Sequence, residues 1–135
     1  MKAVIADLDI WWRAFGRIEP DPGVVAQFTR LARERRLLLL GWIRQELLER
    51  LGDERQAVRM AAILAGFPEV VLLPEDHIAA ASRVRRLRGS GLLLPTRAAL
   101  LWAVAERCGA AIWSVDGRWR PWSTRGAPLY VAAAG

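Results

Sequence analysis

Three acidic residues stand where predicted strands of this sequence end or where the next helix begins. Asp7 directly follows the short apolar run 4–6, Glu46 lies in a predicted helix just after the next apolar run, and Asp116 ends a later run. In α/β proteins, ligand sites lie beyond the carboxyl ends of the strands, so we expect these carboxylates to meet. Carboxylates brought together repel one another, and a hard cation such as Mg²⁺ or Mn²⁺ relieves that repulsion. Such an ion can activate water and hold a phosphodiester for in-line attack.

The elements that must position these acids alternate between strands and helices. We expect strands at 2–6, 37–40, 70–73 and 111–115, and a weak last strand at 129–132. We expect helices at 10–18, 23–35, 42–51, 54–66, 75–88 and 95–107. The stretch 118–128 is expected to be irregular. Short apolar runs that alternate with amphipathic helices are typical of a parallel sheet covered by helices on both faces. The sequence therefore predicts an α/β fold of three layers, with a parallel sheet of four to five strands, in a single domain over residues 1–135.

Composition and charge narrow the class of partner. The chain is 53% hydrophobic and carries a formal net charge of +6, and Lys2 is its only lysine, so nearly all of the positive charge is arginine. Arginine binds phosphates bidentately, and the charge therefore fits RNA, DNA or an acidic protein partner. No apolar stretch reaches the roughly 18 residues that span a bilayer, so no membrane association is expected. The single cysteine, Cys108, cannot form an internal disulfide, which fits a cytoplasmic protein.

Each acid also has a purely structural interpretation. Asp7 or Asp9 could simply cap the following helix. Glu46 could be an exposed helix acid that pairs with Arg50 one turn later. Asp116, which precedes a glycine, could belong to an ordinary turn. Spacing alone does not decide between these interpretations and a shared site.

The tryptophans are open to two interpretations as well. Trp119 and Trp122 could stack on nucleic-acid bases, although tryptophans more often pack inside a protein. Trp11, Trp12 and Trp42, on the early helices, could serve contacts with a partner as readily as core packing.

The order of these motifs resembles the PIN domain, and within it the VapC-like toxin ribonucleases. The resemblance covers nearly the whole chain and rests on Val4-Ile5-Ala6-Asp7-Leu8-Asp9, on Arg44-Gln45-Glu46-Leu47-Leu48 and on residues 103–119, which include Ser114 and Asp116. It implies a PIN-like domain that hydrolyses RNA phosphodiesters as a metal-dependent endoribonuclease. Asp7, Glu46 and Asp116 would be its catalytic and metal-binding residues, with Asp9 as a nearby substitute ligand. The resemblance further implies a small antitoxin protein as partner and a homodimer.

Two positions depart from the family's pattern. Ala98 stands where such proteins usually carry another aspartate, and Arg118 stands where a further acid is frequent. The loss of carboxylates weakens a metal site, whereas Arg97 and Arg118, together with Ser114, could bind the substrate phosphate directly. The alternative is therefore a catalytically impaired PIN-like module that binds RNA or a protein.

A third possibility follows from the first acidic motif. Asp7-Leu8-Asp9 also resembles the opening motif of haloacid dehalogenase-type phosphohydrolases. Ile10 and Trp11 replace the small and hydroxyl residues expected next, and no lysine follows Lys2 to supply the usual basic group. We therefore rank this possibility below the other two.

Overall fold

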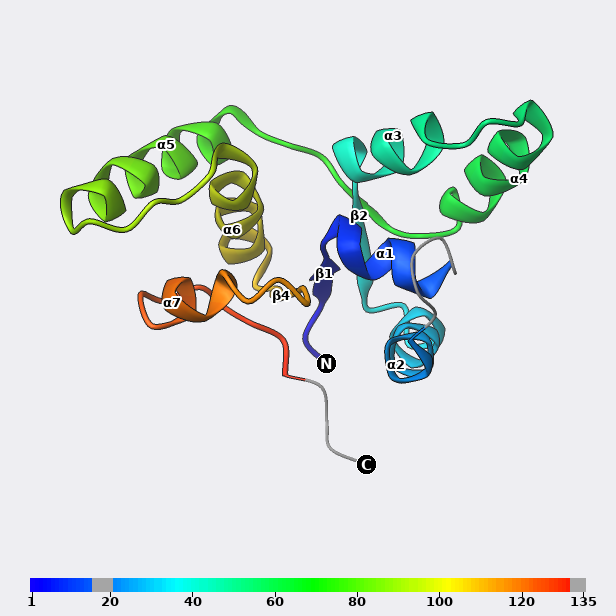
Figure 1. The fold of residues 1–135 in the computed structure, drawn as a ribbon, viewed down its shortest axis with the longest axis horizontal. Helices are drawn as coiled ribbons and strands as arrows, with labels where there is room; N and C mark the ends of the chain where they lie inside the picture. Colours follow the sequence, from blue (N-terminus) through cyan, green and yellow to red (C-terminus); the bar gives the residue numbers. More distant parts are fainter. Residues whose placement is uncertain (16–20, 132–135) are drawn as a thin grey trace.

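Four parallel strands form the sheet at the centre of the molecule (Figure 1). The computed structural model describes residues 1–15 and 21–131. The strands are β1 (Val4–Ala6), β2 (Leu37–Leu40), β3 (Glu69–Val70) and β4 (Ala111–Trp113). Their order is β3-β2-β1-β4, and every neighbouring pair is parallel. The predicted α/β fold with a parallel sheet is confirmed.

The predicted strands 2–6 and 111–115 are shortened to Val4–Ala6 and Ala111–Trp113, and two other predicted strands differ more. β3 is shorter than the predicted strand 70–73, because the chain leaves the sheet at Val71, which is 70% exposed and whose carbonyl accepts a hydrogen bond from Arg107. The expected fifth strand is reduced to an isolated parallel bridge between Ile112 and Leu129. Its predicted last residue, Ala132, lies outside the described residues.

Helices cover both faces of the sheet. They are α1 (Leu8–Ala14), α2 (Pro22–Arg33), α3 (Gly41–Glu49), α4 (Glu54–Leu64), α5 (Pro74–Gly89), α6 (Thr96–Cys108) and α7 (Trp119–Ser123). Figure 1 shows α5 and α6 on one side of the sheet and α2, α3 and α4 on the other. The three-layer arrangement is therefore as predicted. In the described parts of the chain, no helix is long and apolar enough to cross a membrane.

Two helix predictions need correction. α1 begins at Leu8 rather than at residue 10, because the Asp7 side chain accepts a hydrogen bond from the Leu8 amide and caps the helix there. Residues 16–18 of that predicted helix lie outside the described residues. The stretch 118–128, expected to be irregular, contains α7, whose Trp119 and Trp122 are buried in the core.

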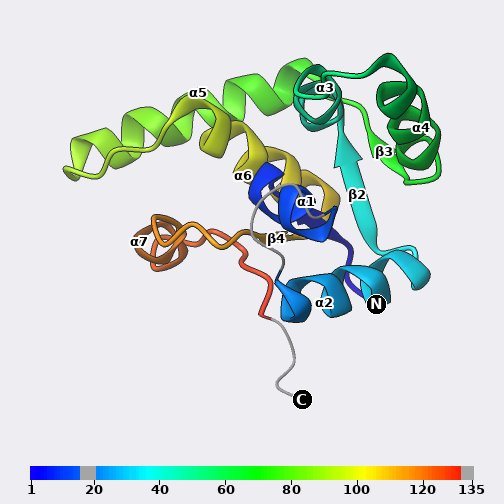
Figure 2. The same cartoon turned by 45° about the vertical axis from the view of Figure 1, so that its right-hand side comes forward.

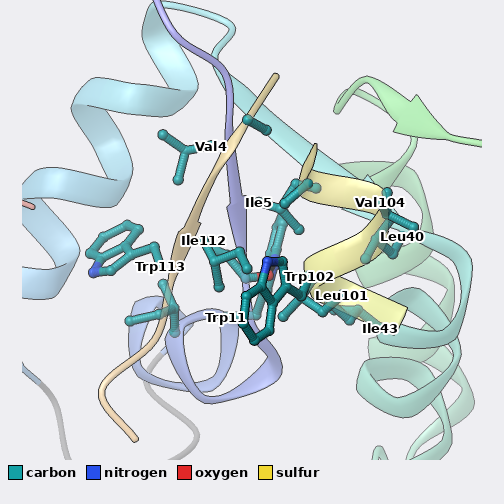
Figure 3. Close-up of a cluster of buried hydrophobic side chains, with 14 of the residues drawn as sticks. Val4, Ile5, Trp11, Leu40, Ile43, Leu101, Trp102, Val104, Ile112 and Trp113 are labelled. Carbon is teal, nitrogen blue, oxygen red and sulfur yellow. Dashed lines mark hydrogen bonds between the residues drawn. The ribbon is translucent and has the colours of Figure 1, made fainter. Parts of the chain in front are cut away.

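The core joins the strands to the helices that follow them (Figure 3). Trp11 is fully buried, its indole nitrogen donates a hydrogen bond to the Ala6 carbonyl at 3.0 Å, and its ring lies edge-on to Phe28 and Phe67 with centroids 4.9 Å apart in each pair. Trp12 is also buried, at 6% exposure. Trp11 therefore holds α1 against the end of β1, and both tryptophans are core residues rather than an exposed surface for partner contacts.

An ion pair between the buried Asp76 and Arg107 joins α5 to α6. Asp76, an acid in the first turn of α5, is 2% exposed. Its carboxylate accepts hydrogen bonds from the Leu73 amide at 2.9 Å and from the Arg107 guanidinium at 2.7 and 3.0 Å. The hydrogen bonds from Arg107 hold the pKa of Asp76 below its ordinary value. The pair thus ties the start of α5 to the last turn of α6.

We predict that Asp76→Ala destabilises the fold by about 1 kcal/mol or more, the usual value for a lost helix cap, because Arg107 loses its partner as well. Since the folded-state pKa is lowered, the stabilisation is present above the ordinary aspartate pKa of about 3.8 and is lost as the pH falls below it. Urea unfolding at pH 7 and pH 3 measures this. Glu75→Ala, an exposed change in the same helical turn, is the control, and equal stability of the two variants at pH 7 would contradict the prediction.

Candidate active site

One pocket at the carboxyl edge of the sheet brings together the three acids singled out from the sequence. Its volume is about 420 Å³. β1 and β4 are parallel neighbours, so Asp7 and the loop that carries Asp116 leave the sheet at the same edge. Glu46 lies on α3 and lines the pocket. Figure 2 shows that α3 begins directly after β2. The lining residues are Asp7, Leu8, Trp42, Glu46, Pro95, Thr96, Arg97, Ala98, Asp116, Arg118, Trp119 and Trp122.

Asp7 serves both as a helix cap and as a pocket residue. Its Oδ1 accepts a hydrogen bond from the Leu8 amide at 2.8 Å, and its own amide donates to the Trp113 carbonyl at 2.8 Å. Burial raises the pKa of Asp7, the hydrogen bond from Leu8 opposes this, and the nearby charges of Asp9 and Asp116 raise the pKa further. The capping interpretation is therefore correct without excluding the functional one, since the same carboxyl group lines the pocket.

Asp116 is held by an arginine two residues later. The guanidinium of Arg118 donates to Asp116 Oδ2 from Nε at 2.9 Å and from Nη2 at 2.7 Å, and the Arg118 amide donates to Oδ1 at 2.9 Å. These hydrogen bonds hold the pKa of Asp116 below its ordinary value. The turn interpretation is thus partly correct: the carboxylate stabilises its own turn, but it does so at the wall of the pocket.

Glu46 pairs across the pocket rather than along its own helix. Its side chain is 11% exposed and forms an ion pair with Arg97, whose side chain is 70% exposed. The proposed partner one turn later, Arg50, instead places its guanidinium 5.2 Å from the centre of a Trp12 ring. The interpretation of Glu46 as an exposed acid paired with Arg50 is therefore wrong.

Asp9 and Ser114, expected as ligands of the site, form a hydrogen bond with each other instead. Asp9 Oδ2 accepts hydrogen bonds from Ser114 Oγ at 2.8 Å and from the Val115 amide at 3.0 Å. Ser114 Oγ in turn accepts from the Asp116 amide at 3.0 Å. Neither residue lines the pocket, so the geometry does not support Asp9 as a substitute metal ligand or Ser114 as a phosphate ligand. Together they brace the loop that carries Asp116 against the first turn of α1.

The acids that line the pocket do not fit a divalent cation as they stand. Within residues 1–15 and 21–131, no group of three or more histidine, cysteine, aspartate or glutamate side chains is placed to hold a metal ion. Guanidinium groups already engage two of the three carboxylates, those of Glu46 and Asp116. Ala98 adds no ligand to the lining at the position where the family pattern has an acid. We therefore derive no reaction step through a metal ion.

Four further residues belong to this pocket that the sequence-based site did not include, and one of them is Pro95, which directly precedes α6. Thr96 lies at the start of α6, Trp42 lies in the first turn of α3, and Leu8 begins α1. The sequence feature that could have indicated these residues is a helix that begins at the carboxyl edge of a parallel sheet.

Trp119 and Trp122 form a packed wall of the pocket. Each is 3% exposed, and their rings lie edge-to-face with centroids 4.9 Å apart, which supports the packing interpretation over base stacking.

Asp7 and Asp116 should respond to substitution in opposite ways. We predict that Asp7→Asn raises the melting temperature at pH 7 by a few degrees, because the buried charge disappears while asparagine can still cap α1. The pKa of Asp7 is raised in the folded protein, so protonated Asp7 stabilises the fold fully below about pH 3.8, and this stabilisation is lost as the pH rises through the raised pKa. The gain in melting temperature of Asp7→Asn should therefore vanish in acid.

Asp116→Asn should slightly lower the melting temperature at pH 7, because the exposed ion pair between Asp116 and Arg118 contributes little to stability. Scanning calorimetry at pH 7 and pH 3 measures both, and shifts of the same sign at pH 7 would contradict the assignment.

Comparison with known proteins gives a likeness of fold. No protein-family model and no curated protein sequence matches the chain. Among solved structures, the crystal structure of VapBC2 from Rickettsia felis bound to a DNA fragment from their promoter contains a chain that matches with a TM-score of 0.72 and 11% sequence identity, over 94% of this chain and 96% of that chain. At this identity the match shows the fold alone. The fold of this protein is PIN-like.

Proposed function

We propose that the pocket binds the phosphodiester backbone of RNA and that the protein is an endoribonuclease of the VapC-like toxin type. The observation that carries the proposal is the meeting of Asp7, Glu46 and Asp116, from three distant segments, in one pocket with two arginines. The PIN-like fold and the matching order of motifs support the same conclusion.

In this proposal the basic and acidic side chains of the pocket have different roles. Arg97 and Arg118 are exposed guanidinium groups at the pocket, and a guanidinium binds phosphate through two parallel hydrogen bonds. They would bind and orient the phosphodiester. Asp7, whose pKa is raised by burial, would take up the proton of the attacking water or hydroxyl group, because a base is most effective when its pKa approaches the operating pH.

Mg²⁺ or Mn²⁺ belongs to the proposal only through the resemblance to the family. Asp7, Glu46 and Asp116 would hold it, and two of these would first have to release their arginines. The resemblance also implies a small antitoxin protein and a homodimer, and the single cysteine fits a cytoplasmic location; these remain predictions. The structural neighbour is itself a VapBC2 complex.

We predict that the purified protein, supplied with Mg²⁺ or Mn²⁺, cleaves a structured RNA internally and that Asp7→Asn lowers the rate at least about a hundredfold, as expected for the loss of a general base. Gel analysis of end-labelled RNA measures the cleavage. Asp53→Asn is the matched control, because Asp53 is an exposed cap of α4 outside the pocket and asparagine can replace it. Equal rates for Asp7→Asn and the wild type would refute the site assignment.

A second candidate is a PIN-like module that binds RNA without cleaving it. The ion pairs of Glu46 and Asp116 favour this candidate, as does Ala98, because together they leave the pocket short of free carboxylates. The haloacid dehalogenase-type alternative has less support, since Asp9, the second acid of its motif, is engaged by Ser114 and Val115 outside the pocket.

Both candidates require phosphate contacts from the two arginines, and this gives a further prediction. Arg97→Ala combined with Arg118→Ala should weaken RNA binding and flatten its salt dependence, because each phosphate contact to a single strand contributes a slope of about −0.7 in log K against log salt. Fluorescence anisotropy at several salt concentrations measures this. An unchanged slope would exclude the arginines as phosphate ligands. Cleavage by the wild type then separates the nuclease from the binding module.

A further inference from the structure

We propose that a small apolar hollow beside the pocket binds one nucleobase of the RNA, the base of the nucleotide whose phosphate contacts Arg118. The hollow has a volume of about 220 Å³ and is lined by Leu92, Leu93, Pro95, Arg118, Pro121 and Trp122. The inference rests on the proposed function, because a base reaches the hollow in this way only when the RNA backbone lies in the pocket. It gives the protein a contact with the bases of RNA in addition to those with the backbone.

The hollow and the pocket share a wall. Pro95, Arg118 and Trp122 line both of them. Arg118 directs its Nε and Nη2 donors to Asp116, and these donors lie in the plane of the guanidinium group. The flat faces of a guanidinium group carry no donor, and nucleobases stack on them. One arginine can therefore bind a phosphate with its edge in the pocket and a base with its face in the hollow.

The hollow also presents an apolar side chain that the core does not bury. Leu93 is 77% exposed, whereas its neighbour Leu94 is 2% exposed. The indole nitrogen of Trp122 donates a hydrogen bond to the Leu93 carbonyl at 3.1 Å, so the backbone is held at this point. Leucine and proline are among the side chains that proteins insert between bases. Trp122 thus supports Leu93 through the backbone while its own ring stays packed in the core.

Size, charge and position favour a base as the occupant. The hollow is smaller than the pockets of roughly 300–1,000 Å³ that enclose drug-sized ligands, so it suits a single ring system. Its described lining is leucine, proline, tryptophan and one arginine, without an acid that would repel a nearby phosphate. A single ribose joins the base and the phosphate of one nucleotide, and here an apolar hollow adjoins a proposed phosphate site. An apolar side chain of a protein partner would fill the same space but would have no such link to the pocket.

The first arm of the test compares RNA with its backbone alone. Isothermal calorimetry measures the binding of a 2′-O-methyl RNA hexanucleotide that contains all four bases and resists cleavage. It also measures a hexamer with the same phosphates in which stable abasic units replace every nucleoside. We expect the wild type to bind the base-bearing hexamer at least about fivefold more tightly, the lower end of what one stacked base contributes. Equal affinity for the two hexamers would overturn the base site and would leave the hollow to a protein partner.

The second arm assigns this preference to the hollow. Leu93→Ser should reduce the preference by lowering the affinity for the base-bearing hexamer alone. Leu93→Phe should keep or increase the preference, because a base can stack on the new ring. Val58→Ser is the matched control, since Val58 is an apolar side chain on α4 that is 61% exposed and lines neither cavity, and it should match the wild type. Melting temperatures verify that each variant is folded.

The outcomes separate the base site from the proposed function. If Leu93→Ser keeps the full preference of the wild type, the base lies elsewhere and the inference is wrong. An equal loss of affinity for both hexamers would also overturn it, because the substitution would then disturb binding of the backbone rather than of a base. If the wild type binds neither hexamer, the proposed function fails and the base site fails with it. If both hexamers bind without a preference, the base site alone fails.

Discussion

Negative charges that share a partly buried pocket must be neutralised, and this constraint organises the site. The parallel sheet delivers Asp7 and Asp116 to the same edge, and α3 adds Glu46. Burial raises the free energy of an ionised carboxyl group, and each like charge raises it further, as the raised pKa of Asp7 reflects. The fold meets this with guanidinium groups on two of the three acids. The acid that remains, Asp7, is the one whose pKa is raised.

The elements that hold the acids are themselves fixed by interactions away from the pocket. Trp11 fastens α1 to the end of β1 through the Ala6 carbonyl, which sets the position of Asp7. The Asp9 and Ser114 hydrogen bonds fix the loop after β4, and the Asp76 and Arg107 pair fixes the far end of α6. Precise placement of charged groups requires such rigid support, because an acid free to move would relax away from its neighbours. The chain thus supports the acids of the pocket rigidly and leaves the two arginines of the pocket exposed.

The sequence predicted the features of the site that depend on local patterns. The run Leu37–Leu40 was predicted with its correct bounds, because four leucines in succession fit a strand buried on both faces. The meeting of Asp7 with Asp116 followed from the rule that parallel strands end at one edge. The partners of Glu46 and Asp9 could not be predicted in this way, because Arg97 and Ser114 lie far from them in sequence. Nor did any local signal show that Asp76 would be buried, since a first-turn acid is usually exposed.

The two departures from the family pattern change the pocket in the same direction. An acid at position 98 would add negative charge, whereas Ala98 adds none, and Arg118 adds a positive charge where an acid is frequent. A pocket lined only by carboxylates repels a phosphodiester until a cation has bound. In this pocket, two exposed guanidinium groups offset two of the three lining carboxylates, so that repulsion is largely removed before any cation arrives. For the proposed binding of RNA, the two arginines would therefore reduce the repulsion that the acids alone would exert on a phosphate.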